Sequence, residues 1–274
     1  MAEREFVHVD LTDHVFTITM DRPEARNALS RQMMKELTGA FDRLNDDGDC
    51  WVGVLQAEGP TFCAGADLKE ALATRSKPAR PSETSAVPEA STKTEPRPAT
   101  APPIMRRRRK PMIACVEGQA FAGGLEIVLS CELVVASTVS QFALTEVKRG
   151  LLAIGGGLFR LPQRLPHNVA MEMLLSGEAK PASFMYEHGF VNRLAEPAET
   201  RAAARELALQ IAANSPVAVQ AALEVAGRAA AEGWTDDEGW IEQGAALARV
   251  QASEDLIEGL RAFSEKRPAQ WKGR

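Results

Sequence analysis

The stretch Pro111-Met-Ile-Ala-Cys-Val-Glu-Gly-Gln-Ala-Phe-Ala-Gly-Gly-Leu-Glu126 decides the fold of this chain. It opens with an apolar run, Met112 to Val116, which is typical of a buried strand. Small residues follow and let the backbone approach another group closely. The apolar segment from Leu125 to Leu133 then indicates a buried helix. We therefore expect a strand, a glycine-rich turn and a helix in direct succession.

The turn before this helix is suited to hold negative charge. A helix N-terminus leaves backbone N–H groups unpaired and carries partial positive charge. It can therefore hold an anion or a developing oxyanion. Glu126 falls in the first turn of the expected helix. Its carboxylate has two readings from the residues alone: a charge that stabilises the helix, which is the commoner case, or a catalytic group.

Strand-like and helix-like patterns alternate on both sides of this stretch, which indicates an α/β architecture. Asn27, in the loop 21–27, is positioned to cap the helix that follows. The expected elements are a hairpin of 4–10 with 14–20, a helix over 29–45, strands at 51–56, 133–137 and 141–144, a helix over 158–165 and helices throughout 199–263. We expect two parts: an α/β core over 1–198 and a helical C-terminal part over 199–274.

The core contains an inserted loop at about 72–105. Lys77 to Pro103 holds seven of the chain's 16 prolines and no aromatic residue. A segment this poor in apolar bulk cannot offset its ordering entropy by burial, so we expect a flexible loop. The basic run Arg106–Lys110 follows; a solvated helix end is the favoured reading and phosphate binding the alternative. Near the C-terminus, Trp271 is either an anchor on a partner surface or part of a frayed end.

Composition narrows the function class. The 274 residues are 45% hydrophobic and 25% charged, with a net charge of −5 and a pI near 5.6. This balance gives no general attraction to nucleic acid or to anionic membranes. No apolar run approaches the roughly 20 residues that span a bilayer, and the first residues lack the features of a signal peptide. We expect no nucleic-acid partner and no membrane association.

The spacing of the cysteines indicates a protein of a reducing compartment, and the spacing of the histidines indicates that no metal site is present. The four cysteines show no C-x-x-C spacing, so free thiols in a cytoplasmic protein are expected. The four histidines are scattered without ligand spacing, which argues against a zinc site.

A second small-residue loop, 62–67, resembles the turn at 118–124 in its chemistry. Asp67 can open a helix there as its N-cap. Two loops whose amides converge on one point form an oxyanion hole. Glu126 and Glu146 lie on or near these elements, and paired carboxyls in different environments can divide into an acid and a base. The residues thus indicate carbonyl polarisation with proton transfer.

A set of motifs resembles the crotonase superfamily, the enoyl-CoA hydratase/isomerase family. The resemblance runs from about Phe6 to Lys272, interrupted only over 72–110. The motifs are Arg22-Pro-x-x-x-Asn-Ala-Leu29, Phe62-Cys-Ala-Gly-Ala-Asp-Leu68, Glu117-Gly-Gln-Ala-Phe-Ala-Gly-Gly-Leu-Glu126, Phe142-Ala-Leu-Thr-Glu146, Gly189-Phe-Val-Asn-Arg193 and Glu258-Gly-Leu-Arg-Ala-Phe-Ser-Glu-Lys-Arg267.

The resemblance implies a role for individual residues. The amides of Ala66 and Gly123 would hold a thioester oxygen. Glu126 and Glu146 would be the two hydratase glutamates, with the acid and base roles left open. CoA, as part of the substrate and not a separate cofactor, would contact Arg26, Ala64, Ala66, Asp67, Leu68, Lys69 and, from a neighbouring subunit, Phe263 and Lys266.

The resemblance also implies a fold, an assembly and an activity. The fold would be a spiral of ββα units, with the helical C-terminal part used to form a trimer or a hexamer of two trimers. The activity would be hydration of a trans-2-enoyl-CoA in fatty-acid metabolism. Thr145 and the segment 153–157 lack prolines common in the family. Both departures fall where an acyl chain would run and leave its length and branching open.

Three alternatives stay open. The first is another activity of the same family, such as double-bond isomerisation or dehydration of a functionalised acyl-CoA. The second is a non-catalytic interaction protein whose proline-rich loop binds a partner as polyproline II. The third, RNA binding through Arg106–Lys110, is disfavoured by the net charge and by the absence of interleaved aromatic residues.

Overall fold

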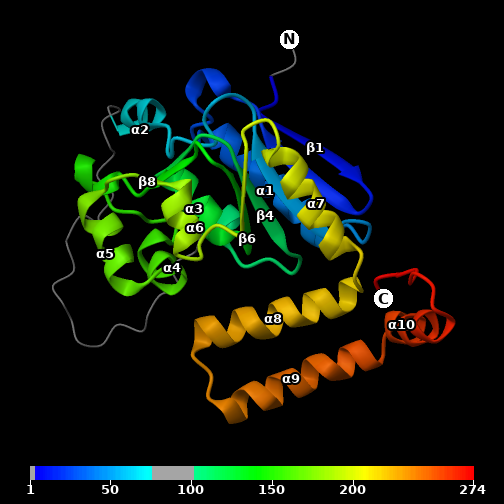
Figure 1. Ribbon diagram of the computed structural model, residues 1–274. Helices are drawn as coiled ribbons and strands as arrows, with labels where there is room; N and C mark the ends of the chain where they lie inside the picture. Colours follow the sequence, from blue (N-terminus) through cyan, green and yellow to red (C-terminus); the bar gives the residue numbers. More distant parts are fainter. Residues whose placement is uncertain (1–3, 76–101) are drawn as a thin grey trace.

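The computed structural model describes residues 4–75 and 102–274. Its core is a six-stranded sheet in the order β1-β2-β3-β4-β6-β9, in which only the β1–β2 pair is antiparallel (Figure 1). These strands are β1 (Val7–Thr12), β2 (Val15–Met20), β3 (Val52–Ala57), β4 (Met112–Val116), β6 (Leu133–Ser137) and β9 (Arg193–Ala195). A smaller sheet contains β5 (Gln119–Phe121), β7 (Gln141–Ala143) and β8 (Lys180–Pro181).

Helices alternate with the strands, as expected for an α/β chain. The α-helices are α1 (Arg31–Asp46), α2 (Leu68–Arg75), α3 (Gly123–Ser130), α4 (Gly157–Arg164), α5 (His167–Ser176), α6 (Ala182–Glu187), α7 (Thr200–Ala212), α8 (Pro216–Glu232), α9 (Asp236–Gln251) and α10 (Glu254–Glu265). The described residues also form the short 3₁₀ helices η1 (Pro23–Ala25), η2 (Pro103–Met105) and η3 (Glu146–Arg149).

The predicted N-terminal hairpin is confirmed. Val7 pairs with Met20 and Thr12 with Val15, which leaves Asp13 and His14 as a two-residue turn. Both turn residues have positive φ, at 54° and 62°. Such a turn matches the twist of the two strands and is most easily made by small polar residues such as Asp.

Two apolar layers cover the sheet. On one face, α7 packs over β3 and β4 through residues that include Val54, Cys115 and Ala204. On the other face, alternate residues of the same strands, such as Leu55, join the larger core with α1 and α3. A strand that is buried on both faces reads as a continuous apolar run, which is why Met112–Val116 could be recognised from the sequence.

Two helix starts differ from the expectation. The helix expected over 29–45 begins at Arg31, and its N-cap is Ser30, whose hydroxyl accepts from Met33 N. Asn27 does not cap it, because its side chain is buried and bonds elsewhere. The helix expected over 125–133 spans Gly123–Ser130, since Ala122 already turns the chain and Cys131 returns to an extended conformation. Glu126 remains in its first turn, as predicted.

The expected inserted loop lies mostly outside the described residues. At its edges, α2 continues to Arg75 and η2 covers Pro103–Met105. The reading of the following basic run as a solvated helix end holds only in part: Arg106, Arg107 and Arg109 are exposed after η2, whereas Arg108 and Lys110 are buried. Arg108 is buried, donates to the backbone oxygen of Ser130 and lies over the Phe41 ring, while buried Lys110 donates to Asp47 O.

The C-terminal helices extend away from the sheet. In Figure 1, α8 and α9 form a long pair beside the core, and α10 follows at its end. Trp271 is not frayed, because its indole N–H donates to Ala213 O at 2.8 Å. The expected C-terminal part, 199–274, includes α7. This helix packs on the sheet of the core, whereas α8 to α10 extend away from it.

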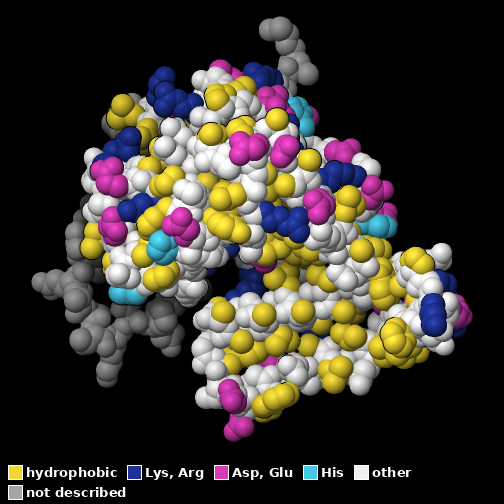
Figure 2. Space-filling view, viewed as in Figure 1, with side chains coloured by type: hydrophobic (Ala, Val, Ile, Leu, Met, Phe, Trp, Pro, Cys, Tyr) yellow, Lys and Arg dark blue, Asp and Glu magenta, His cyan; other side chains and the backbone are white. Residues whose placement is uncertain are grey.

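Apolar side chains are spread over this extension, as Figure 2 shows. The most exposed of the large ones on α9 and α10 are Trp240, Ile241, Leu260 and Phe263, each more than half exposed. A monomer rarely leaves such a surface uncovered. In the described part of the chain, no helix is both long enough and apolar enough to cross a bilayer.

Candidate active site

The loop after β3 is held in place by its neighbours. Leu29 N donates to Gly65 O at 2.8 Å, and Asp67 N donates to Leu29 O at 3.2 Å. Ala64 N donates to Arg26 O at 3.0 Å. These bonds use the N–H groups of Ala64 and Asp67 and the carbonyl oxygen of Gly65, and none of them uses the N–H group of Ala66. The loop therefore presents one N–H group in a fixed backbone.

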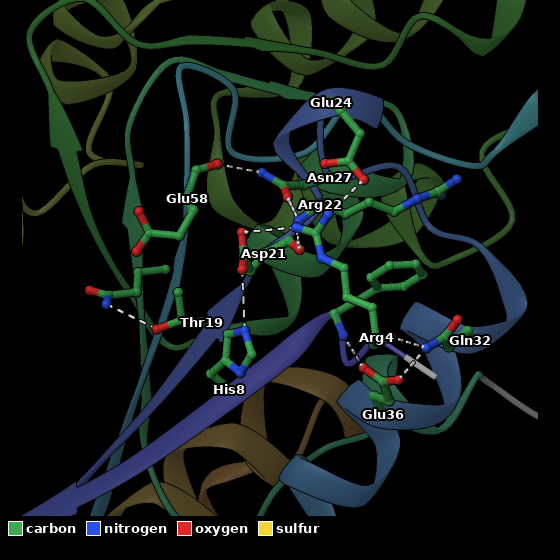
Figure 3. Close-up of polar contacts among 12 residues, drawn as sticks. Arg4, His8, Thr19, Asp21, Arg22, Glu24, Asn27, Gln32, Glu36 and Glu58 are labelled. Atoms are coloured by element: carbon green, nitrogen blue, oxygen red, sulfur yellow. Dashed lines mark hydrogen bonds and ion pairs between the residues drawn. The ribbon is translucent and has the colours of Figure 1, made fainter. Parts of the chain in front are cut away.

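Asn27 and Arg22 fix the segment that supports this loop (Figure 3). Asn27 Nδ2 donates to the backbone oxygens of Glu58 and Thr61 at 2.9 and 2.8 Å, while its Oδ1 accepts from Arg22 N. The Arg22 guanidinium contacts the Asp67 carboxylate at 2.8 Å. From the sequence, no role was assigned to Arg22, and Asn27 was expected to cap a helix. A sequence motif does not show which way a side chain points.

Asp67 caps α2, as predicted. Its Oδ1 accepts from Lys69 N and Glu70 N, both at 3.2 Å. The hydrogen bond from Arg22, followed by that from Glu70 N, lowers the pKa of Asp67. Because the carboxylate is used in holding the loop, its contribution at this site is to position Ala66.

The second loop docks directly on the first. Cys63 N donates to Gln119 O at 3.0 Å, and Phe121 N donates to Cys63 O at 2.9 Å. A Cβ added to Gly65 would lie 2.7 Å from the Cβ of Ala122 and 3.2 Å from Gly123 N. The two loops thus meet closely at Gly65, which also has a φ of 95°. A side chain at this position would separate them.

Two backbone amides face each other where the loops meet. The position of a Cβ on Gly123 would be 3.7 Å from Ala66 N. Across residues 4–75 and 102–274, neither Ala66 N nor Gly123 N donates a hydrogen bond. Gly123 is the first residue of α3, so its N–H carries the partial positive charge of the helix N-terminus. Two such donors are suited to stabilise a developing oxyanion.

Glu126 is buried next to this amide pair, with only 4% of its surface exposed. Its Oε1 accepts from Gly155 N at 2.7 Å and from Gly157 N at 2.9 Å. Burial raises the pKa of Glu126, while the two amides and the Arg160 charge oppose that rise. A carboxyl that is held firmly and titrates above its usual range suits general acid–base chemistry.

Glu146 supplies a second carboxyl from η3. Its Oε2 is buried and accepts no hydrogen bond from the described residues. Burial, and to a lesser extent the negative charge of Glu126, raise the pKa of Glu146. The charge of Glu126 thus acts on Glu146, although the surroundings of the two carboxyls differ: Glu126 accepts two backbone hydrogen bonds and Oε2 of Glu146 accepts none from the described residues.

The residues expected to contact CoA divide into two groups. Arg26, Ala66, Leu68 and Lys69 are exposed, with Ala64 half-buried, around the first loop. A cavity of about 470 Å³ adjoins them and is lined by Leu29, Ser30, Arg31, Met34, Ala66, Asp67 and Glu70. Phe263 and Lys266 lie on the distant α10 and at its C-cap, and in this single chain they do not approach the loop (Figure 1).

Sequence reasoning missed the residues that hold Glu126. Gly155 and Gly157 donate to its carboxylate, and Arg160 donates to the backbone oxygen of Gly155. The run of glycines at 155–157 was the available signal, because it allows close approach of backbone to another group. In the described ranges, no three His, Cys, Asp or Glu residues are grouped in a way that could hold a metal ion.

Comparison with known proteins places the chain in a family. The model of the enoyl-CoA hydratase/isomerase family matches residues 10–274. The chain belongs to this family. An enoyl-CoA hydratase of Mycobacterium tuberculosis is 34% identical over 97% of this chain and 96% of its own length. A carnitinyl-CoA dehydratase of Proteus mirabilis is 35% identical over 98% of both chains.

The fold agrees with that of solved crotonases. The crystal structure of an enoyl-CoA hydratase from Mycobacterium tuberculosis H37Rv matches with a TM-score of 0.86 at 38% identity, covering 99% of this chain and all of the other. The expected crotonase-like α/β fold with a helical C-terminal part is therefore confirmed.

Proposed function

We propose that this crotonase is an enoyl-CoA hydratase, which adds water reversibly to a trans-2-enoyl-CoA thioester. One observation carries the proposal: Glu126 lies in the same first turn of α3 as the Gly123 amide, and in the described residues neither that amide nor the nearby Ala66 amide donates a hydrogen bond. The pKa of Glu126 is raised, and its charge contributes to the raised pKa of a second carboxyl, Glu146. Enzymes that polarise a carbonyl and transfer protons next to it require both features. The family places this chemistry on a CoA thioester.

The reaction divides between the amides and the carboxyls. One glutamate, as carboxylate, removes a proton from water while the water oxygen bonds to the β-carbon. The α,β double bond shifts its electrons toward the thioester oxygen, where the N–H groups of Ala66 and Gly123 stabilise the negative charge. The other glutamate, as carboxylic acid, gives its proton to the α-carbon, and the sum is addition of one water. The acid and base roles belong to the pair.

CoA serves as the handle of the substrate, and no separate cofactor enters the scheme. Exposed Ala66, Leu68 and Lys69, with half-buried Ala64, support a CoA site at the first loop, and a cavity lies beside Ala66. Arg26 is a candidate phosphate contact. Phe263 and Lys266 would reach the CoA of a neighbouring copy, because they are exposed and distant from their own loop.

The proposed assembly is a trimer, or two trimers paired as a hexamer, in the cytoplasm. The exposed apolar side chains of α9 and α10 support an assembly through the C-terminal helices. The four buried free cysteines agree with a reducing compartment.

The direct test is hydration of crotonyl-CoA, followed by loss of the conjugated-enoyl absorbance. We expect turnover by the wild type and a fall of about 10²–10⁴ in kcat for Glu126→Gln and for Glu146→Gln. Glu172→Gln is a matched control, because Glu172 lies in an exposed ion pair with Lys180. Normal rates in both active-site variants would refute the two-glutamate mechanism.

A second activity in the same family is the dehydration of a functionalised acyl-CoA. Thr145 and the segment 153–157 lack prolines that are common in the family, and the curated relatives include a carnitinyl-CoA dehydratase. A panel of longer, branched and hydroxylated acyl-CoAs would decide between the two. A higher kcat/KM on a hydroxylated thioester than on any plain enoyl-CoA would favour the second activity.

A further inference from the structure

We infer that Arg160 is a positioning residue for Glu126, because it fixes the 155–157 turn whose amides hold that carboxylate. The inference rests on the proposed acid–base role of Glu126. It concerns a residue that does not touch the reacting atoms in the scheme above. Arg160 lies in α4, directly after the three glycines.

The guanidinium of Arg160 ties two segments together. Its Nη1 donates to Gly155 O at 3.2 Å, and its Nη2 donates to Met105 O. It also packs on the turn itself, since a Cβ on Gly156 would lie 2.7 Å from Nη1. Gly156 has a φ of 108°, so no side chain stiffens the turn from within. The restraint comes from outside, through Arg160.

This restraint reaches the carboxylate through one residue. Gly155 accepts from Arg160 at its oxygen and donates to Glu126 Oε1 at its nitrogen. If the turn moved, Oε1 would lose the bonds from both Gly155 and Gly157, and Oε2 would change its aim. A displacement of about 1 Å in a catalytic group can cost about 10²-fold in rate.

Electrostatics act in the same direction as the geometry. Among the described residues, Arg160 on α4 acts electrostatically on Glu126, and the charge of Glu126 acts on Glu146 on η3. Burial lowers the pKa of Arg160, and nearby Arg108 adds to that effect, yet a guanidinium stays protonated in proteins. Its charge favours the ionised form of Glu126. Loss of Arg160 therefore raises the pKa of Glu126, whichever role Glu126 plays.

Arg164 offers a matched control on the same helix. Its guanidinium is also buried against backbone, donating to Cys131 O at 2.7 Å and to Glu132 O at 3.3 Å. It makes no contact with the 155–157 turn or with Glu126 in the described residues. Changes at 164 thus report the structural cost of losing a buried arginine from α4.

The experiment compares the full-length wild type with Arg160→Gln, Arg160→Lys and Arg164→Gln. The readouts are thermal stability, kcat and KM for an enoyl-CoA across pH, and the pKa of Glu126 from ¹³C-carboxyl NMR, assigned with Glu126→Gln. For Arg160→Gln we expect kcat to fall about 10²-fold with little change in KM, and the limb of the pH profile that reports Glu126 to move to higher pH. Arg160→Lys keeps the charge and should return that limb toward its wild-type position.

Two results would overturn the inference. One is an Arg160→Gln profile that keeps its wild-type shape while only stability falls. The other is an equal shift of the Glu126 pKa in Arg164→Gln, which would mark a general loosening of α4. Because the NMR measurement needs no turnover, an enzyme inert toward every thioester would contradict the proposed function while still deciding the role of Arg160.

Discussion

A Cβ on Gly155 would lie 2.7 Å from Oε2 of Glu126, while Gly155 N lies 2.7 Å from Oε1 of the same carboxylate. The backbone of residue 155 therefore forms one wall around the proposed acid–base group. Glycine is required there for space, since its φ lies outside the left-handed region. The same contact gives a direct test of how firmly Glu126 must be held.

Gly155→Ala is expected to displace the Glu126 carboxylate and to lower kcat/KM by about 10²-fold. The fold should persist, because the added methyl meets side-chain atoms and no backbone. Steady-state kinetics on an enoyl-CoA would measure the loss. Gly39→Ala in α1 is the control, since nothing lies within 4 Å of the added Cβ. Equal activity of the two variants would contradict the arrangement described for Glu126.

Gly65→Ala is expected to separate the loops that carry the Ala66 and Gly123 amides. Its Cβ would collide with that of Ala122 at 2.7 Å, and loss of one oxyanion donor costs about 10²–10³ in kcat. Gly189 also has a positive φ, but nothing lies within 4 Å of a Cβ added there. Gly189→Ala therefore measures the effect of backbone strain without a collision. If Gly189→Ala lost as much kcat as Gly65→Ala, the loss could not be assigned to the loops.

Glu146→Gln should gain stability at neutral pH while losing activity. Burial raises the pKa of Glu146. The folded protein therefore binds a proton at this carboxyl more tightly than the unfolded chain does, in which the pKa of glutamate is about 4.3. The stability contributed by this group is present below that pH and is lost as the pH rises through the folded pKa. Removing the charge should add about 1 kcal/mol at pH 7, or about 2–4 °C in Tm.

Melting curves of wild type and Glu146→Gln between about pH 4 and pH 8 would check this. The difference in Tm should shrink as the pH falls. A difference that stays constant over the whole range would show that titration of Glu146 does not contribute to it.

Asp67→Asn should weaken the support of the first loop. The Arg22 contact lowers the pKa of Asp67, so this group stabilises the fold above the unfolded pKa of about 3.9, and the contribution is lost as the pH falls through the folded pKa. The amide keeps the cap of α2 but loses the charge pair, at a cost of about 1 kcal/mol at pH 7. Urea unfolding of the wild type, Asp67→Asn, Arg22→Gln and the double variant would give the coupling energy between the two residues. If the losses in unfolding free energy of the two single variants simply added up in the double variant, the Arg22–Asp67 contact would not stabilise the fold.

Ile241→Glu should dissociate the proposed trimer. Ile241 is 71% exposed on α9, and a buried unpaired charge at an interface is strongly unfavourable. Sedimentation velocity would compare it with Leu175→Glu, an equally exposed apolar position on α5 of the core. A wild-type monomer, or dissociation only by the α5 variant, would remove α9 from the interface.

Much of the fold followed from local patterns in the sequence. Runs such as Met112–Val116 are apolar because both faces of the sheet are covered, and the helix of Glu126 was anticipated within a few residues. Its start at Gly123 was not, because the turn at Ala122 depends on a positive φ that alanine seldom adopts. Local composition carries little information on such a conformation.

The sequence predicted which residues form the candidate site better than it predicted the contacts that hold them. Glu126, Glu146, Ala66 and Gly123 were all named; the structure places Gly123 close to Ala66 and lets the charge of Glu126 act on Glu146. The burial of Arg108 and the Arg22–Asp67 pair were not foreseen, since long charged side chains usually remain in water. Only the tertiary arrangement shows which of them turns inward.

The parallel pairing of β3 with β4 sets an order of events in folding. Ala66 follows β3 and Gly123 follows β4, while the whole segment between Ala57 and Met112 separates the two strands. Pairing two strands that lie so far apart in the sequence costs entropy before they gain any hydrogen bonds, so we expect the pair of amides to assemble late. The N-terminal hairpin needs only a two-residue turn and can form early. Recovery of catalysis after denaturation thus reports the docking of the central strands. Insertions between them would add only about 0.6 kcal/mol for each doubling of loop length, which leaves that segment free to diverge while the chemistry stays fixed.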